Sequence, residues 1–169
     1  DRRTIYRYYP TKEHLLLAIA ADLFRDFSER FLLVEFAEEM SGFKKVSHLF
    51  DEYFRLLKET PELIIFLGMI DMSVGQNPQN REIYLELDKY GMKTDERLTE
   101  LIEEGQRDGS IGISFNPKQT AITINNSLIA LATRVATYQP KSLYTSEGFV
   151  WKMLSRQGEM FKNSLECRT

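Results

Sequence analysis

The residues best suited to chemistry gather in the first 12 positions of the chain. They are cationic or hydroxyl-bearing side chains, namely Arg2, Arg3, Thr4, Tyr6, Arg7, Tyr8 and Lys12. Phosphate oxygens accept hydrogen bonds from all of these groups, and arginine can also read guanine edges in the major groove through two parallel bonds. The pattern therefore favours an anion-binding surface suited to duplex DNA.

Charge is distributed unevenly along the chain. The whole chain carries a net charge of −3, whereas residues 1–12 hold four basic residues against Asp1 alone, a local +3. The remainder must carry −6, so a basic tip is attached to an acidic body. This asymmetry predicts separate tasks for tip and body, and the alternative is a solvated terminal charge cluster.

Constellations typical of catalysis are missing from the sequence. The two histidines, His14 and His48, belong to no H-E-x-x-H or Glu-x-x-His pattern, and no G-x-S-x-G elbow or phosphate-binding glycine loop occurs. The single cysteine, Cys167, cannot form an internal disulfide or a cysteine-based metal site. We therefore expect a non-enzymatic protein without a catalytic residue, a metal ion or a cofactor.

Length and composition predict one globular domain, or one domain with a small appendage. The chain has 169 residues, of which 43% are hydrophobic and 12% aromatic. It contains no apolar stretch long enough to span a membrane, and the segment after Asp1 is not typical of a signal peptide. The single cysteine is typical of a reducing compartment, so a cytoplasmic location is expected.

Apolar residues recur at spacings of three and four in most of the chain, which predicts helices. We expect a short helix and six long ones, over residues 2–9, 12–33, 46–60, 61–74, 81–107, 117–138 and 145–166. Gly42 is predicted to lie in a loop, residues 75–78 to form a turn, and residues 110–115 to form either a loop or a short strand. The predicted class is an all-α helical bundle.

Three sequence signals mark helix starts. Thr11 can cap the helix that begins at Lys12. Pro61 suits a first helical position, and Asn116 followed by Pro117 and Gln119 combines a cap, a first-turn proline and a capping-box residue.

The segment T-I-Y-R-Y-Y-P-T-K-E-H-L-L resembles the end of the helix-turn-helix in TetR-family transcriptional regulators. The usual family form is T-[LIV]-Y-x-[YH]-F-x-[SN]-K-x-x-L-L, and the chain differs at Tyr9 and Thr11. The matching positions are Thr4, Ile5, Tyr6, Tyr8, Lys12, Leu15 and Leu16. A second, weaker likeness is the E-G-Q-R-D-G turn at 104–109, before a helix of low charge.

The resemblance implies a role for each matched position. Residues 2–8 would be the recognition helix, with Tyr9 in the core. Thr4, Tyr8 and Lys12 would contact phosphates, Arg2, Arg3 and Tyr6 would approach bases, and Arg7 shares their polar face. In this family two further helices precede the recognition helix, so the resemblance implies that this chain is part of a longer repressor.

The resemblance also implies two domains and a homodimer. Residues 1–16 would complete the DNA-binding domain and begin a linker helix, and residues 17–169 would form the ligand-binding and dimerisation domain. The helices at 117–138 and 145–166 would pair with their copies, for which their low-charge faces are suited. The alternative is that these faces serve only the core of the monomer.

A small-molecule effector is expected in the helical body. Its candidate contacts are large, soft or polar side chains of the middle helices: Phe27, Phe54, Phe66, Met69, Met72, Tyr90, Asn125 and Asn126. An aromatic or methionine residue at helical spacing is more often a core residue than a pocket wall. An amide in an apolar helix needs a hydrogen-bond partner, which could be a ligand, another helix or the second subunit.

Two functions are therefore open. The first is a ligand-responsive regulator, a repressor that binds a palindromic operator as a dimer and is released by its effector. The alternative is a helical small-molecule carrier or protein-interaction module without DNA binding.

Overall fold

The computed structural model describes residues 2–73, 81–137 and 147–167, and within these ranges it is helical without a β-strand. The helices are α1 (Arg2–Tyr8), α2 (Lys12–Leu32), α3 (Gly42–Glu59), α4 (Pro61–Ser73), α5 (Arg81–Arg107), α6 (Pro117–Thr137) and α7 (Glu147–Leu165). The all-α prediction is confirmed. The predicted turn at 75–78 and the predicted start of the last helix at 145 or 146 lie outside the described residues.

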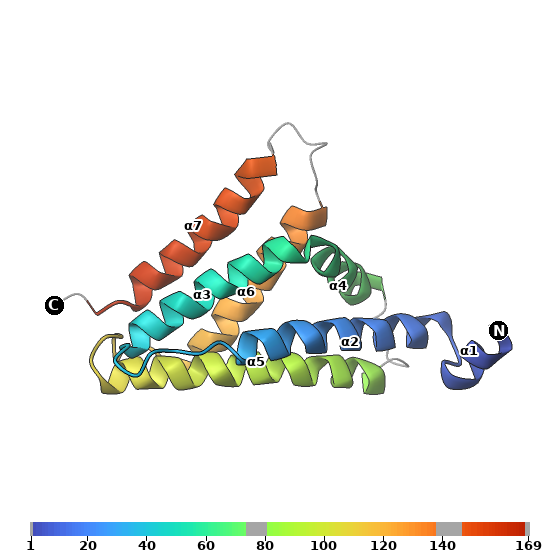
Figure 1. The fold of residues 1–169 in the computed structure, drawn as a ribbon, viewed down its shortest axis with the longest axis horizontal. Helices are drawn as coiled ribbons and strands as arrows, with labels where there is room; N and C mark the ends of the chain where they lie inside the picture. Colours follow the sequence, from blue (N-terminus) through green and yellow to red (C-terminus); the bar gives the residue numbers. More distant parts are fainter. Residues whose placement is uncertain (1, 74–80, 138–146, 168–169) are drawn as a thin grey trace.

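The long helices form an elongated bundle (Figure 1). Helices α2 and α5 lie side by side along one edge, and α3 and α6 both pack against α5. Helix α4 packs on α2 and α6, and α7 covers α3 and α6. Helix α1 projects beyond the bundle at the end opposite the carboxyl end of α7.

The main core lies between α2, α3, α5, α6 and α7. Its most deeply buried large side chains include Phe31, Phe50, Leu98, Ile124 and Leu154, one from each of these helices. A second, smaller cluster joins α2, α4 and α5 near the α1 end, through Leu17, Ala20, Ile70 and Leu87. Helices α2 and α5 contribute buried residues to both clusters and therefore run through both halves of the bundle.

The helix starts follow the predicted capping chemistry. The hydroxyl of Thr11 accepts a hydrogen bond from the N–H of His14 at 3.2 Å, which caps α2. The side-chain oxygen of Asn116 accepts one from the N–H of Gln119 at 2.9 Å, with Pro117 at the first position of α6. Pro61 begins α4 as expected. These local signals are confirmed.

The prediction that Gly42 lies in a loop is wrong. Gly42 is buried and is the first residue of α3, capped by Ser41. A Cβ atom there would lie 2.1 Å from the backbone nitrogen of Gly105 on α5. Glycine is therefore required at this position for close approach of two backbones rather than for a turn.

Residues 110–115 form a loop, not a strand, with one isolated bridge between Ile111 and Glu166. The N–H of Gly112 donates to the carbonyl of Leu165 at 3.1 Å, and the N–H of Cys167 donates to the carbonyl of Ser110 at 3.0 Å. The loop therefore fixes the end of α7 against the rest of the bundle. No helix among the described residues is long and apolar enough to cross a membrane.

Candidate functional site

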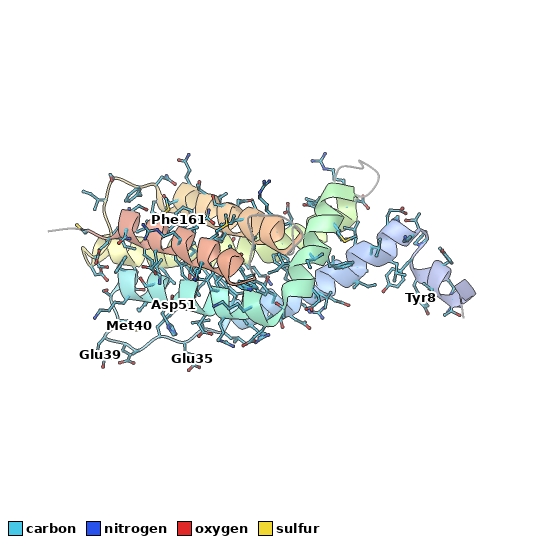
Figure 2. The ribbon with its side chains drawn as sticks, turned by 90° about the horizontal axis from the view of Figure 1, so that it is seen from above. Tyr8, Glu35, Glu39, Met40, Asp51 and Phe161 are labelled. Atoms are coloured by element: carbon cyan, nitrogen blue, oxygen red, sulfur yellow. The ribbon has the colours of Figure 1, made fainter. Side chains whose placement is uncertain are left out.

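The first candidate surface is α1 with the start of α2. Thr4, Tyr6, Arg7 and Tyr8 are all exposed, and Tyr8 retains 67% of its accessible surface. Figure 2 shows Tyr8 at the projecting end of the molecule, away from the bundle. Arg7 donates a hydrogen bond to the Tyr8 hydroxyl at 3.1 Å and lies 5.0 Å from the centre of its ring. The guanidinium and the phenol are thus held together on one face.

The side chains of Arg2 and Arg3 lie outside the described part of the structure. Tyr9 is half-buried and lines a small groove with Ile5, Tyr6 and Leu15. Ile5 shares a side of α1 with Tyr9, which predicts that both pack inward. Ile5 is 46% exposed, so this prediction is wrong for Ile5. The physical reason is that α1 has only the start of α2 against it in the described part of the chain.

Lys12 is exposed at the amino terminus of α2, where backbone N–H groups point outward. These groups favour negative charge: the pKa of Glu13 is lowered by a backbone hydrogen bond first and by the Thr11 hydroxyl second. An anion near Lys12 therefore meets both a formal charge and a helix terminus. This junction lies directly beside the exposed face of α1.

The second candidate site is a cavity of about 510 Å³ in the body of the bundle. Its walls come from α2, α3, α4, α5 and α6. The lining side chains used below are Phe24, Phe27, Tyr53, Tyr84, Asp88, Asp95, Asn125 and Asn126. A volume of this size is typical of small-molecule sites.

Aromatic rings make up one side of the cavity. Phe24 and Phe27 on α2 stack with ring centres 6.2 Å apart, and Phe27 meets Tyr53 of α3 edge to face at 5.8 Å. The Tyr53 hydroxyl is buried and has no hydrogen-bond partner among the described residues. Burial strongly raises the pKa of this phenol, so it remains neutral and can donate or accept a hydrogen bond.

A carboxylate and an amide of the cavity lining are joined by a hydrogen bond. Asn125 of α6 donates from its side-chain nitrogen to Oδ1 of Asp95 on α5 at 2.7 Å. Of the three partners open to this amide from the sequence, the structure shows another helix. Burial raises the pKa of Asp95, the hydrogen bond from Asn125 opposes that rise, and the nearby Asp88 adds to it.

The eight residues predicted to contact a ligand are dispersed. Phe27, Asn125 and Asn126 line the cavity. Phe54 is buried against Gly158 and Tyr53 in the core, Phe66 packs on the second cluster, and Met69 is 60% exposed. Tyr90 is half-buried outside the cavity lining, and the Met72 side chain lies outside the described residues. Their roles in binding stay predictions.

Sequence reasoning missed Asp95 and Asp88. Both lie on α5, whose many charges suggest a solvated surface. The available signal was their spacing of seven residues, which places them on one face of a helix, in register with Leu98 and Ile102 of the buried side. Phe24 and Tyr53 recur at helical spacing, which indicates a buried helix face but does not distinguish a core position from a cavity lining.

Helices α6 and α7 leave apolar side chains uncovered. Ile122 and Ile129 of α6 are 39% and 38% exposed, and Met153 and Met160 of α7 are 38% and 61% exposed. Among the described residues, no group of three or more His, Cys, Asp or Glu side chains could hold a metal ion. Cys167 is exposed and free.

No protein-family model and no curated protein matches the chain. Among solved structures, a bacterial regulatory protein of the tetR family from Rhodococcus RHA1 matches it with a TM-score of 0.71 and 18% sequence identity. The match covers 98% of this chain and 80% of that protein. The bundle described above therefore has the all-α fold seen in a TetR-family regulator.

Proposed function

We propose that this protein is a dimeric, ligand-responsive regulator of transcription that binds duplex DNA through α1 and the start of α2. The observation that carries the proposal is the position of α2. Its first residue, Lys12, belongs to the exposed cationic surface, and its Phe24 and Phe27 line the cavity. One continuous helix thus connects both candidate sites.

The length of α2 makes this connection mechanically direct. Twelve residues separate Lys12 from Phe24, which corresponds to about 18 Å at the rise of an α-helix. A ligand that displaces Phe24 or Phe27 would tilt the helix and move its exposed end. A dimer must present two such ends to successive major grooves about 34–36 Å apart, so a small tilt would alter the fit.

The uncovered apolar side chains of α6 and α7 support a two-fold assembly. Ile122, Met153 and Met160 are exposed on α6 and α7, two helices that pack against each other, whereas the partly exposed Ile129 lines the cavity. Apolar and methionine-bearing patches of this kind are typical of subunit interfaces. We expect Ile122→Glu with Met160→Glu to convert a dimer into a monomer in sedimentation experiments.

Repression with release by the effector is the simplest form of the coupling. A ligand that changes DNA affinity 100-fold supplies about 2.7 kcal/mol of coupling free energy, within the usual range for allosteric proteins. This coupling requires only that the cavity binds its ligand with different affinity in the two positions of α2.

The salt dependence of duplex binding, measured on the full-length protein, tests the DNA-binding part of the proposal. Three phosphate contacts per subunit made by cationic side chains, Lys12 among them, give six per dimer. We then expect log K to fall with log salt at a slope near −5. Lys12→Ala should weaken binding to all sequences alike and reduce that slope by about 2 per dimer.

Lys44→Ala is the matched control, because Lys44 is an equally exposed lysine on α3 at the opposite end of the bundle. It should leave DNA affinity and slope unchanged. Equal effects of the two variants would show that net charge rather than the α1 surface drives binding. Ligand binding without any DNA binding at low salt would favour the alternative, a helical small-molecule carrier.

A further inference from the structure

We infer that the cavity selects an organic cation, a protonated amine carried on an aromatic or other apolar body. This inference rests on the proposed function only in that the same cavity serves the effector. It is carried by the charge, the aromatic walls and the hydrogen bonding of the described lining residues.

The charge of the lining is one-sided. Asp88 and Asp95 project from the same face of α5, whereas no lysine, arginine or histidine lines the cavity among the described residues. Asp95 likewise has no cationic ion-pair partner in the described part of the chain. Asp95 is half-buried and Asp88 is exposed, and the charge of Asp88 disfavours the ionised form of Asp95. A bound cation would relieve this repulsion.

The hydrogen bond from Asn125 arranges Asp95 for such a ligand. It occupies Oδ1 at 2.7 Å and ties the carboxylate to α6, so the side chain is held in one orientation. The second oxygen, Oδ2, remains available to accept a hydrogen bond. A protonated amine supplies both the N–H donor and the positive charge that this oxygen lacks.

The aromatic side chains favour a cation for an independent reason. Phe24, Phe27, Tyr53 and Tyr84 contribute rings to the lining from three different helices. A positive charge near the face of a ring is attracted by its quadrupole, and the rest of the rings accommodates an apolar body. An anion would meet the same ring faces and the two carboxylates unfavourably.

Tyr53 lines the cavity, and its hydroxyl is buried without a hydrogen-bond partner among the described residues. Because burial keeps this phenol neutral, the negative charge of the described lining comes from Asp88 and Asp95 alone.

Three probes of nearly equal shape test the selectivity: 1-naphthylmethylamine, 1-naphthylmethanol and 1-naphthoate. They place a cation, a neutral hydroxyl and an anion on the same ring system. By titration calorimetry at pH 7, we expect the ammonium to bind at least tenfold more tightly than the alcohol, and the carboxylate to bind most weakly. Equal affinities for the ammonium and the alcohol, or preference for the carboxylate, would overturn the inference.

The variant Asp95→Asn should lower the ratio of ammonium affinity to alcohol affinity from at least tenfold to near one. Glu96→Gln is the matched control, because this neighbouring residue carries the same charge but is exposed and does not line the cavity. It should retain the preference. Retention of the preference in Asp95→Asn, with a folded protein by circular dichroism, would contradict the role assigned to this carboxylate.

The calorimetry contains no DNA, so it tests the inference separately from the proposed function, and a duplex-binding assay with and without the ammonium tests the effector role. Tight ammonium binding with no effect on duplex affinity would leave the inference standing and refute the effector role of the cavity. DNA binding with no preference among the three probes would refute the inference and leave the DNA-binding part of the proposed function standing.

Discussion

The two ends of the bundle are built on different principles. At the end away from α1, α3 and α5 approach so closely at Gly42 and Gly105 that a single added methyl group would collide with backbone. Nearer to α1, in the body of the bundle, the same α5 helix lies beside a cavity of about 510 Å³ lined by Asp88 and Asp95. One end is closed by fixed contacts, and the other retains room and charge.

Hydrogen bonds reinforce the closed end. The carboxylate of Asp108 accepts from the N–H of Gly42 at 2.7 Å and from the N–H of Ser110 at 2.8 Å, and the Ser110 hydroxyl accepts from the N–H of Phe43 at 3.0 Å. Gln106 donates to the carbonyls of Gly112 and Phe115 at 3.0 and 2.9 Å. These bonds hold the start of α3 and the loop at 110–115 against the end of α5.

The largest expected effect is at the closed end, for Gly42→Ala. The added Cβ would lie 2.1 Å from a backbone nitrogen, which cannot rotate away as a side chain can. We expect a loss of at least about 3 kcal/mol of unfolding free energy, at the upper end of overpacking costs. Urea denaturation measures this loss.

Gly109→Ala is the control for that substitution. Gly109 has φ of 79°, and nothing lies within 4 Å of a Cβ placed there. Only backbone strain of about 1–2 kcal/mol is therefore expected. If Gly42→Ala costs no more than Gly109→Ala, the close contact does not stabilise this end in the way described.

The next effect is expected for Asp108→Ala, which removes the acceptor for the N–H of Gly42 at the start of α3 and for the N–H of Ser110 in the loop after α5. Loss of such a cap costs about 1–2 kcal/mol. Burial raises the pKa of Asp108, but the hydrogen bonds from Ser110 and Gly42 together outweigh it, and the net shift is downward from 3.8. The stabilisation is thus present above pH 3.8 and is lost as the pH falls through the lowered value. Urea titrations across this range should show the variant approaching wild type in acid, and a constant difference would contradict the cap.

A smaller effect of opposite sign is expected in the cavity, for Asp95→Asn. The pKa of Asp95 is raised from 3.8, chiefly by burial. The protonated Asp95 side chain therefore makes its full favourable contribution to the unfolding free energy below pH 3.8. This contribution is lost as the pH rises through the raised pKa. At pH 7 we expect the variant to be more stable by about 0.5 kcal/mol, because solvent screens this partly exposed group. Thermal unfolding at pH 7 and pH 3.5 measures the stability difference between the variant and wild type. Destabilisation of the variant at pH 7 would mean that the contacts around the cavity are as tightly fixed as those at Gly42.

The smallest effect on stability is expected for Tyr8→Ala on α1. Tyr8 is 67% exposed and its hydroxyl and ring interact with the neighbouring Arg7, so the unfolding free energy should change by less than about 0.5 kcal/mol. Duplex affinity should nevertheless fall, as measured by fluorescence anisotropy. A loss of stability above 1 kcal/mol would show that this tyrosine packs within the protein and is not part of a free surface.

The sequence by itself determined the helices and their starts, because periodicity and capping are local. Thr11, Pro61 and the Asn116–Gln119 segment act on backbone groups within one turn, so their effects could be read without knowing the fold. The basic, hydroxyl-bearing α1 was equally visible, since neighbours in sequence make up its surface. The likeness of this segment to TetR-family regulators anticipated the fold that the structure shows.

Only the tertiary structure decided which helices meet and where space remains between them. Gly42 suggests a loop in sequence and proves to be a helix crossing because Gly105, 63 positions away, lies against it. Asp95 suggests solvent and proves to line a cavity because Asn125 reaches it from another helix. Both outcomes depend on contacts between residues distant in the chain, and helical periodicity specifies which face is buried but not which partner covers it.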